Sequence, residues 1–158
     1  MALKNFDEIV EKAKKSGVRN RVVIAGADAE NILLGAFEAQ DDGFATPVLV
    51  GPGLKIVQML EKLGLKDKTY RLVETTPDQD VTQVAIDLIN RGEGDVLMRG
   101  NTQTREFLIP LLEKENGLRT NKLLTHIDLV SMPEYHKLIA IGDVTVTIEP
   151  NLNQKRAI

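Results

Sequence analysis

Four apolar segments, each typical of a buried β-strand, recur along the first two thirds of the chain at nearly equal intervals. Their starts are about 25 residues apart, which is room for one strand, one helix and the loops that join them. The segments between them place apolar residues at helical spacing and precede glycines that can end a helix. This alternation predicts βαβ units and an α/β fold with a mostly parallel sheet. The expected strands are 21–26, 46–51, 70–74 and 95–98, and the expected helices are 3–16, 29–41, 54–63 and 77–90.

The start of the last of these helices carries a recognisable signal. Thr76-Pro-Asp-Gln79 matches a capping box with proline at the first helical position, which predicts that the helix begins at residue 77.

Composition narrows the class of protein. The chain has 158 residues, 42% of them hydrophobic and 27% charged, and a formal net charge of −3, so no overall field attracts nucleic acid. It has no cysteine, which excludes disulfide scaffolds, thiolate metal sites and a cysteine nucleophile. The acidic residues near its start are unlike a signal peptide, and no apolar run reaches membrane-spanning length. These features favour a soluble cytoplasmic protein.

The regular alternation of strand and helix segments ends after residue 100. Residues 104–112 have helical spacing, but Pro110 predicts either a kink or a second helix that starts there. The β-rich segments 123–132 and 136–141 predict an antiparallel pair, with a further short strand over 144–148. Residues 150–154 predict a turn into a helix that the chain end cuts short. We therefore expect a first α/β domain over 1–122, the start of a second over 123–158, and a fragment of a protein about twice as long.

The segment from Asp95 to Thr104 carries the clearest chemical signal. It predicts a buried strand that ends in a turn of small residues and opens a helix. Backbone N–H groups and the positive end of the helix dipole would converge there, so the turn suits phosphate or another anion. Arg99 adds a fixed positive charge. The structural alternative is that Asn101 or Thr102 simply caps the helix.

Several short motifs together resemble the phosphate acetyltransferase and phosphate butyryltransferase family, with the butyryl branch the nearer. They are Arg99-Gly100, Phe107-Leu108, Gly117-Leu-Arg-Thr120, Thr125-His126, Gly142-Asp143 and Pro150, together with Phe6-Asp-Glu-Ile9 and Pro47-Val-Leu-Val-Gly51. The match would cover the first half of a family member. The resemblance implies a three-layer α/β/α fold like that of the isocitrate and isopropylmalate dehydrogenase superfamily, followed by an antiparallel β extension after residue 120.

The resemblance also implies an activity. Family members transfer an acyl group between coenzyme A and phosphate, so that acyl-CoA and phosphate give CoA and acyl phosphate. They need no metal or covalent cofactor, and they are usually homo-oligomers. Their partners would be these small molecules, with no nucleic acid or membrane. Most catalytic groups, an Arg and a Ser–Asp pair among them, would come from the second half, so no catalytic residue is assigned here.

The candidate substrate-binding residues come from the turn that ends the fourth expected strand, from the loop Gly117-Leu-Arg-Thr120 and from the other family motifs. They are Arg99, Gly100, Asn101, Thr102, Thr104, Arg105, Arg119, Thr120, His126 and Asp143. From sequence alone, Arg119 could be a surface arginine in a turn, His126 a core histidine and Asp143 a turn residue.

Two positions depart from the family pattern. Ile109 stands where many members have arginine, and Arg105, one helical turn earlier, could substitute if the helix is continuous. Arg99 replaces the more usual lysine, which keeps the charge but changes its shape.

Two other functions stay open. A non-catalytic domain that binds an anion or acyl phosphate would keep the same turn. A metal-dependent dehydrogenase of related architecture would need clustered acids for Mg²⁺, and this sequence has no convincing cluster.

Overall fold

The computed structural model describes residues 3–143, 146–147 and 149–157. The chain forms two compact units, one made of Gly17–Leu118 and the other of Met1–Ser16 together with Arg119–Ile158. Each unit is described by itself below. The domain boundary expected after residue 122 stays a prediction.

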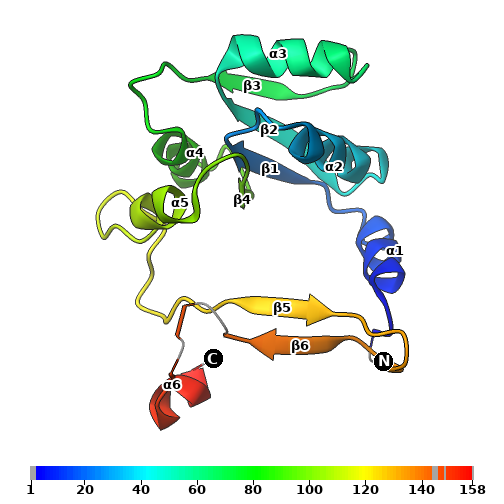
Figure 1. The fold of residues 1–158 in the computed structure, drawn as a ribbon, viewed down its shortest axis with the longest axis vertical. Helices are drawn as coiled ribbons and strands as arrows, with labels where there is room; N and C mark the ends of the chain where they lie inside the picture. The colour runs from blue at the N-terminus through cyan, green and yellow to red at the C-terminus, as the bar shows by residue number, and fades with distance from the viewer. Residues whose placement is uncertain (1–2, 144–145, 148, 158) are drawn as a thin grey trace. The chain divides into compact units, whose positions relative to one another are not determined.

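The larger unit is built on a four-stranded sheet (Figure 1). Its strands are β1 (Asn20–Ala25), β2 (Ala45–Gly51), β3 (Arg71–Glu74) and β4 (Val96–Arg99). They lie in the order β3-β2-β1-β4, and all neighbours run parallel. The predicted α/β fold with a mostly parallel sheet is confirmed, and each strand lies within one residue of its expected bounds.

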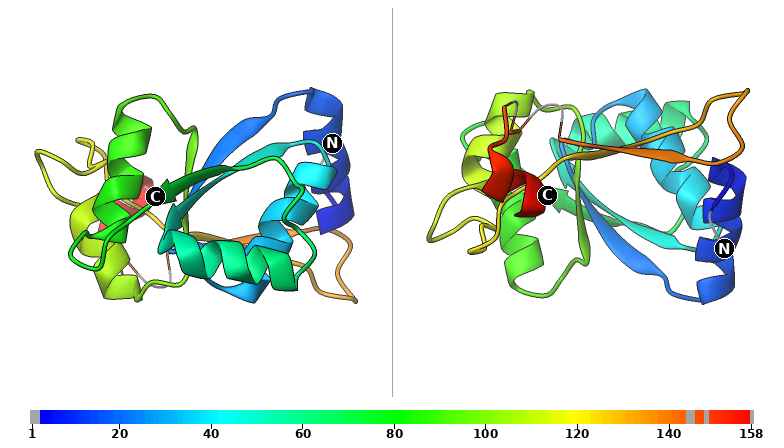
Figure 2. Two further views of the ribbon diagram at one scale, coloured as in Figure 1. Left: turned by 90° about the horizontal axis from the view of Figure 1, so that it is seen from above. Right: turned by 90° about the horizontal axis from the view of Figure 1, so that it is seen from below.

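Helices cover both faces of this sheet (Figure 2). They are α2 (Glu30–Asp41), α3 (Gly53–Lys62), α4 (Val81–Asn90) and α5 (Thr104–Leu111). Ile24 and Leu49 pack with α2 and α3, whereas the neighbouring Val23 and Val48 pack with α4. Successive strand residues point to opposite faces, so strands buried on both sides must be apolar at nearly every position. This explains why the strands were readable from sequence.

The start of α4 differs from the prediction. The helix begins at Val81, and Asp80 is its N-cap, with a carboxylate that accepts from the backbone N–H groups of Thr82 (2.8 Å) and Gln83 (3.2 Å). The capping-box residues instead close a separate turn, in which the Thr76 N–H donates to Gln79 Oε1 over 2.8 Å. The expected start at residue 77 was wrong because Asp80 supplies the competing cap.

Of the two alternatives for Pro110, the second helix starting there was wrong, and the kink stays a prediction. The helix runs unbroken from Thr104 to Leu111 with Pro110 inside it. A proline in the final turn removes one backbone donor, and the chain still closes with the Leu112 N–H donating to the Leu108 carbonyl over 3.1 Å.

The smaller unit contains an antiparallel strand pair and two helices. They are α1 (Phe6–Ser16), β5 (Ile127–Val130), β6 (Ile139–Gly142) and α6 (Leu152–Ala157). The predicted antiparallel pair is confirmed, with Ile127 opposite Gly142, but both strands are shorter than expected. Part of the strand expected over 144–148 lies outside the described residues. None of the helices in the described part of the chain has the length and apolar character needed to span a bilayer.

Candidate functional site

The ends of β1 and β4 meet closely at the carboxyl edge of the sheet. The N–H of Gly100 donates to the Ala25 carbonyl over 2.9 Å, and the N–H of Asn101 donates to the Gly26 carbonyl over 2.7 Å. A side chain at Gly100 would place its Cβ only 2.1 Å from the Gly26 oxygen. Glycine is therefore required at position 100, because only a residue without a Cβ lets the backbone after β4 approach the backbone after β1 this closely.

Arg99, the last residue of β4, reaches the first residue of α5. Its guanidinium Nη1 donates to Thr104 Oγ1 over 2.7 Å and to the Thr102 carbonyl over 3.3 Å. The Arg99 side chain is exposed but is anchored to the turn. Its positive charge adds to that of the helix dipole at the N-terminus of α5. The structure thus brings the six candidates that lie between Arg99 and Arg105 together around one turn.

Neither Asn101 nor Thr102 caps α5. The N-cap is Gln103, and no side chain accepts a hydrogen bond there. The Thr102 hydroxyl oxygen is buried and has no hydrogen-bond partner among the described residues. The first N–H groups of α5 are thus left without a side-chain acceptor, as an anion-binding turn requires.

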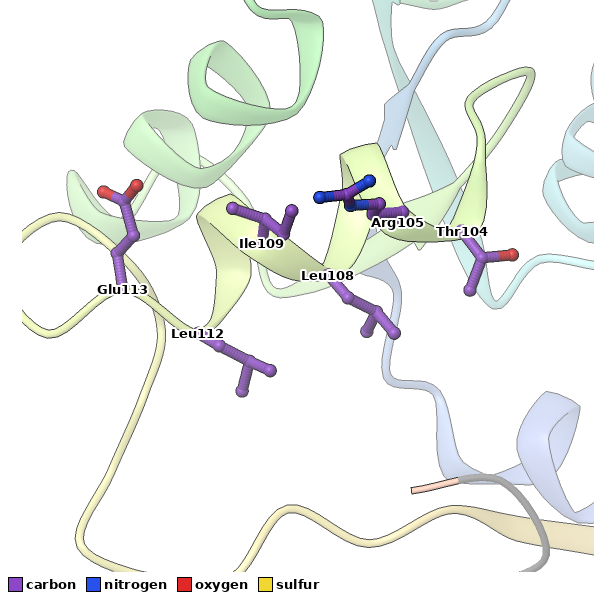
Figure 3. A pocket seen from close by; sticks show the side chains of 6 residues that line it. All are labelled: Thr104, Arg105, Leu108, Ile109, Leu112 and Glu113. Atoms are coloured by element: carbon purple, nitrogen blue, oxygen red, sulfur yellow. The ribbon is translucent and has the colours of Figure 1, made fainter.

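A shallow depression of about 610 Å³ lies along α5 (Figure 3). Leu108, Ile109 and Leu112 make it largely apolar, and Arg105 adds a positive charge. Arg105 and Ile109 line the same depression of one continuous helix, which satisfies the geometric condition for Arg105 to substitute for the family arginine.

The turn after β2 offers no comparable opening. The Glu74 side chain lies so close to Gly53, the first residue of α3, that a Cβ there would be 2.9 Å from its carboxyl carbon. The N-terminus of α3 is therefore covered by an acidic group of the chain itself, which offsets the helix dipole.

Sequence reasoning missed a polar cluster at the same edge. Lys55 of α3 donates to Asp28 Oδ2 over 2.5 Å, and the Asn101 amide donates to Asp28 Oδ1 over 3.4 Å. One feature of the sequence could have indicated this cluster. A lysine in the first turn of a helix is unfavourable next to the positive end of the dipole, so an acidic partner nearby is expected.

The other four candidates belong to the smaller unit. Arg119 and Thr120 are exposed, and Thr120 Oγ1 accepts from the Lys122 N–H over 3.2 Å. Asp143 is buried, and its Oδ1 accepts from the N–H groups of Val146 (2.9 Å) and Thr147 (3.2 Å). Asp143 thus holds the chain after β6 through these two bonds, and its role as a substrate contact stays a prediction.

His126 is partly exposed rather than a fully buried core histidine. Its Nε2 lies 3.5 Å from Asp128 Oδ1, and its Nδ1 is buried without a hydrogen-bond partner among the described residues. In the described part of the chain, no three His, Asp or Glu side chains gather in an arrangement that could hold a metal ion.

Comparison with known proteins gives a consistent picture. A family model described as phosphate acetyl/butaryl transferase matches residues 56–158, which include β4 and α5. The chain is 30% identical over 153 residues to a phosphate butyryltransferase of Clostridium acetobutylicum. The aligned region covers 97% of this chain and 50% of that protein. It is 26% identical to a phosphate acetyltransferase of Thermotoga maritima, covering 95% and 50%. The chain spans about half the length of the curated relatives it matches.

Solved structures agree on the fold. A phosphotransacetylase from Streptococcus pyogenes superposes with a TM-score of 0.76 at 14% identity, over 93% of this chain and 54% of the other. A branched-chain phosphotransacylase from Enterococcus faecalis superposes with a TM-score of 0.63 at 20% identity, over 86% and 46%.

Proposed function

As the chain belongs to the phosphate acetyl/butaryl transferase family, we propose that the complete protein transfers an acyl group between coenzyme A and inorganic phosphate. The reaction is acyl-CoA and phosphate giving CoA and acyl phosphate. In the direction of acyl-CoA synthesis, the CoA thiolate attacks the carbonyl carbon of the acyl phosphate and phosphate leaves. Such a step needs donors that hold the phosphate and the oxyanion that develops.

One observation supports a phosphate-binding role for this chain most directly. The turn between β4 and α5 combines a fixed guanidinium with helix N–H groups that no side chain caps. Gly100, Asn101, Thr102 and Thr104 form this turn, and anions are stabilised at such a helix start. We assign the phosphate to it, with Arg99 and Arg105 as the cationic groups.

The depression along α5 suits the apolar part of an acyl-CoA. Leu108, Ile109 and Leu112 give it an apolar lining, with Arg105 among them. Ligand sites commonly combine an apolar surface with a few polar groups that set orientation.

The remaining assignments rest on the resemblance. Arg119, Thr120, His126 and Asp143 are proposed as substrate contacts from the smaller unit. The Arg and the Ser–Asp pair that the family uses in catalysis are expected in the part of the relatives beyond the match. We also propose a homo-oligomer that works in the cytoplasm without a metal or covalent cofactor.

A thiol-release assay tests the proposal. The complete protein, given butyryl-CoA or acetyl-CoA, should release CoA only when inorganic phosphate is present. Arg105→Met should lower kcat/KM for phosphate by about tenfold to a hundredfold, because it removes one charged hydrogen-bonding group. Arg91→Met is the matched control, since Arg91 follows the C-terminus of α4 and pairs with Glu93.

A second candidate is a domain that binds acyl phosphate without turnover, which would need only the turn between β4 and α5. It predicts that the protein binds acetyl phosphate in a calorimetric titration but releases no CoA thiol. CoA release equal with and without phosphate would contradict the acyltransferase.

A further inference from the structure

Three polar side chains from separate parts of the larger unit meet at the carboxyl edge of the sheet. Asp28 follows β1, Lys55 lies in the first turn of α3, and Asn101 follows β4. Asp28 accepts from both of the others, with Lys55 Nζ at 2.5 Å and Asn101 Nδ2 at 3.4 Å. The Asp28 side chain is only 11% exposed, whereas that of Lys55 is 56% exposed. A well-buried acid therefore holds an accessible amine beside the proposed phosphate turn.

Helix stability does not explain this arrangement. A cation in the first turn of α3 faces the positive end of the helix dipole, which Glu74 beside Gly53 offsets but does not reverse, so the dipole does not favour Lys55 there. Asp28 is close enough in sequence to cap α2, yet the N-cap of that helix is Ala29 and no side-chain cap bond forms. Its carboxylate contacts Lys55 and Asn101 instead.

An ion pair between α2 and α3 shows what an ordinary surface pair looks like. Lys62 of α3 contacts Glu30 of α2 at 3.2 Å, with side chains 73% and 53% exposed. Pairs this exposed contribute little to stability. Among the described residues, the side-chain hydrogen bonds of this pair include no third group, whereas Asp28 also binds Asn101, which adjoins Gly100.

We propose that Lys55 is a further cationic contact for a phosphate group of the substrate, and that Asp28 is the positioning residue that holds Lys55 and Asn101 for this purpose. An ammonium group has three donors, and one bond to Asp28 leaves two for phosphate oxygens. This inference rests on the proposed acyl transfer, because it names a contact of the same site. The phosphate could be inorganic phosphate, the acyl phosphate or a phosphate of CoA.

Steady-state kinetics of the complete protein test the role of Lys55. Lys55→Met should raise a KM about tenfold or more with little change in kcat, because a charged hydrogen bond made in both ground and transition states is lost. Lys62→Met is the matched control and should leave both KM values unchanged. Lys55→Arg should restore part of the affinity. A raised KM for phosphate alone identifies inorganic phosphate or acyl phosphate, and a raised KM for CoA alone identifies a CoA phosphate.

A double-mutant cycle tests whether Asp28 acts through Lys55. Asp28→Asn should change the affected KM by at least about twofold in the wild-type background and by a smaller factor in Lys55→Met, where Asn101 alone remains for Asp28 to hold. An equal effect of Asp28→Asn in both backgrounds would contradict the positioning role.

The outcomes separate this inference from the proposed function. If the protein transfers acyl groups and Lys55→Met behaves like Lys62→Met, the Lys55 contact is wrong and the activity stands. If no transfer occurs, calorimetric titration with inorganic phosphate and with CoA decides. Weaker binding by Lys55→Met than by Lys62→Met supports the contact, and equal binding or no binding overturns it.

Discussion

The two units of this chain use the same kinds of apolar residues in opposite ways. In the larger unit, Ile24 and Leu49 lie in the middle of the sheet with no exposed surface, and helices cover both faces. In the smaller unit, neither α1 nor α6 has a buried residue, and Ile127 of β5 is 60% exposed. Leu129 and Ile141 of the same strand pair are also exposed.

This difference shows that a segment can form helices and strands without also forming a hydrophobic core. Parallel strands become stable by burial on both faces, and the larger unit provides that burial itself. An antiparallel pair can form its hydrogen bonds with little burial, but two strands alone are marginal in water. We therefore expect the free energy of unfolding to come mainly from the larger unit.

The largest expected effect tests this contrast directly. Phe37→Ala, on the buried face of α2, should lower the free energy of unfolding by about 3–5 kcal/mol, because it removes a fully buried aromatic side chain. Ile127→Ala should lower it by about 0.5 kcal/mol or less, because that side chain is already largely in water. Urea denaturation followed by circular dichroism measures both values. Similar costs for the two variants would show that β5 is buried in solution.

The difference in burial between the two units also explains which parts of the fold could be predicted from the sequence. The four parallel strands were located closely because burial on both faces leaves continuous apolar runs. The strands of the smaller unit were expected to be longer, because exposed apolar residues near β5, such as Leu123 and Leu124, resemble strand residues without belonging to one. The start of α4 was missed because Thr76 and Asp80 are both good caps, and only the structure shows which one the helix uses.

A second prediction concerns the close contact between the ends of β1 and β4. Gly100→Ala should lower the free energy of unfolding by about 1–3 kcal/mol, because the new Cβ would overlap the Gly26 carbonyl oxygen. Gly35→Ala is the matched control. Its Cβ would meet nothing within 4 Å, and alanine in the middle of α2 should stabilise the protein by about 0.5–1 kcal/mol. If both variants change the melting temperature in the same direction, the strand ends are less tightly joined than described.

The candidate site was only partly readable from sequence for a related reason. The turn from Arg99 to Thr104 is continuous in the chain, so its residue types already indicated an anion site. Asp28 and Lys55 lie far apart in the sequence, and the pattern does not reveal that β4 pairs with β1. The contact of Asp28 with Asn101 depends on that strand order.

A third prediction compares one helix cap in each unit. Asp80→Ala should lower the free energy of unfolding by about 1 kcal/mol, because two N–H groups at the start of α4 lose their acceptor while the helix is packed on the sheet. Asn151 and Gln154 cap α6 reciprocally, each side chain accepting from the backbone N–H of the other. Asn151→Ala should nevertheless leave the main transition unchanged, because α6 buries no residue. A shared loss of stability would mean that the two units unfold together.

The smallest expected effect is a pH dependence that comes from the larger unit alone. At the amino edge of its sheet, Asp95 accepts hydrogen bonds from the Arg21 guanidinium and backbone N–H, which lower the pKa of its carboxyl group from 3.8 to about 2. A carboxyl group with a lowered pKa in the folded state stabilises that state fully at pH values above its unfolded pKa. The stabilisation is then lost as the pH falls from about 4 towards 2. The melting temperature of the wild type should therefore exceed that of Asp95→Asn at pH 7, and the two curves should converge as the pH approaches 2. Because the pair is exposed to solvent, added salt should reduce the difference at pH 7. A gap that stays constant across this range would show that the variant acts through packing instead of charge.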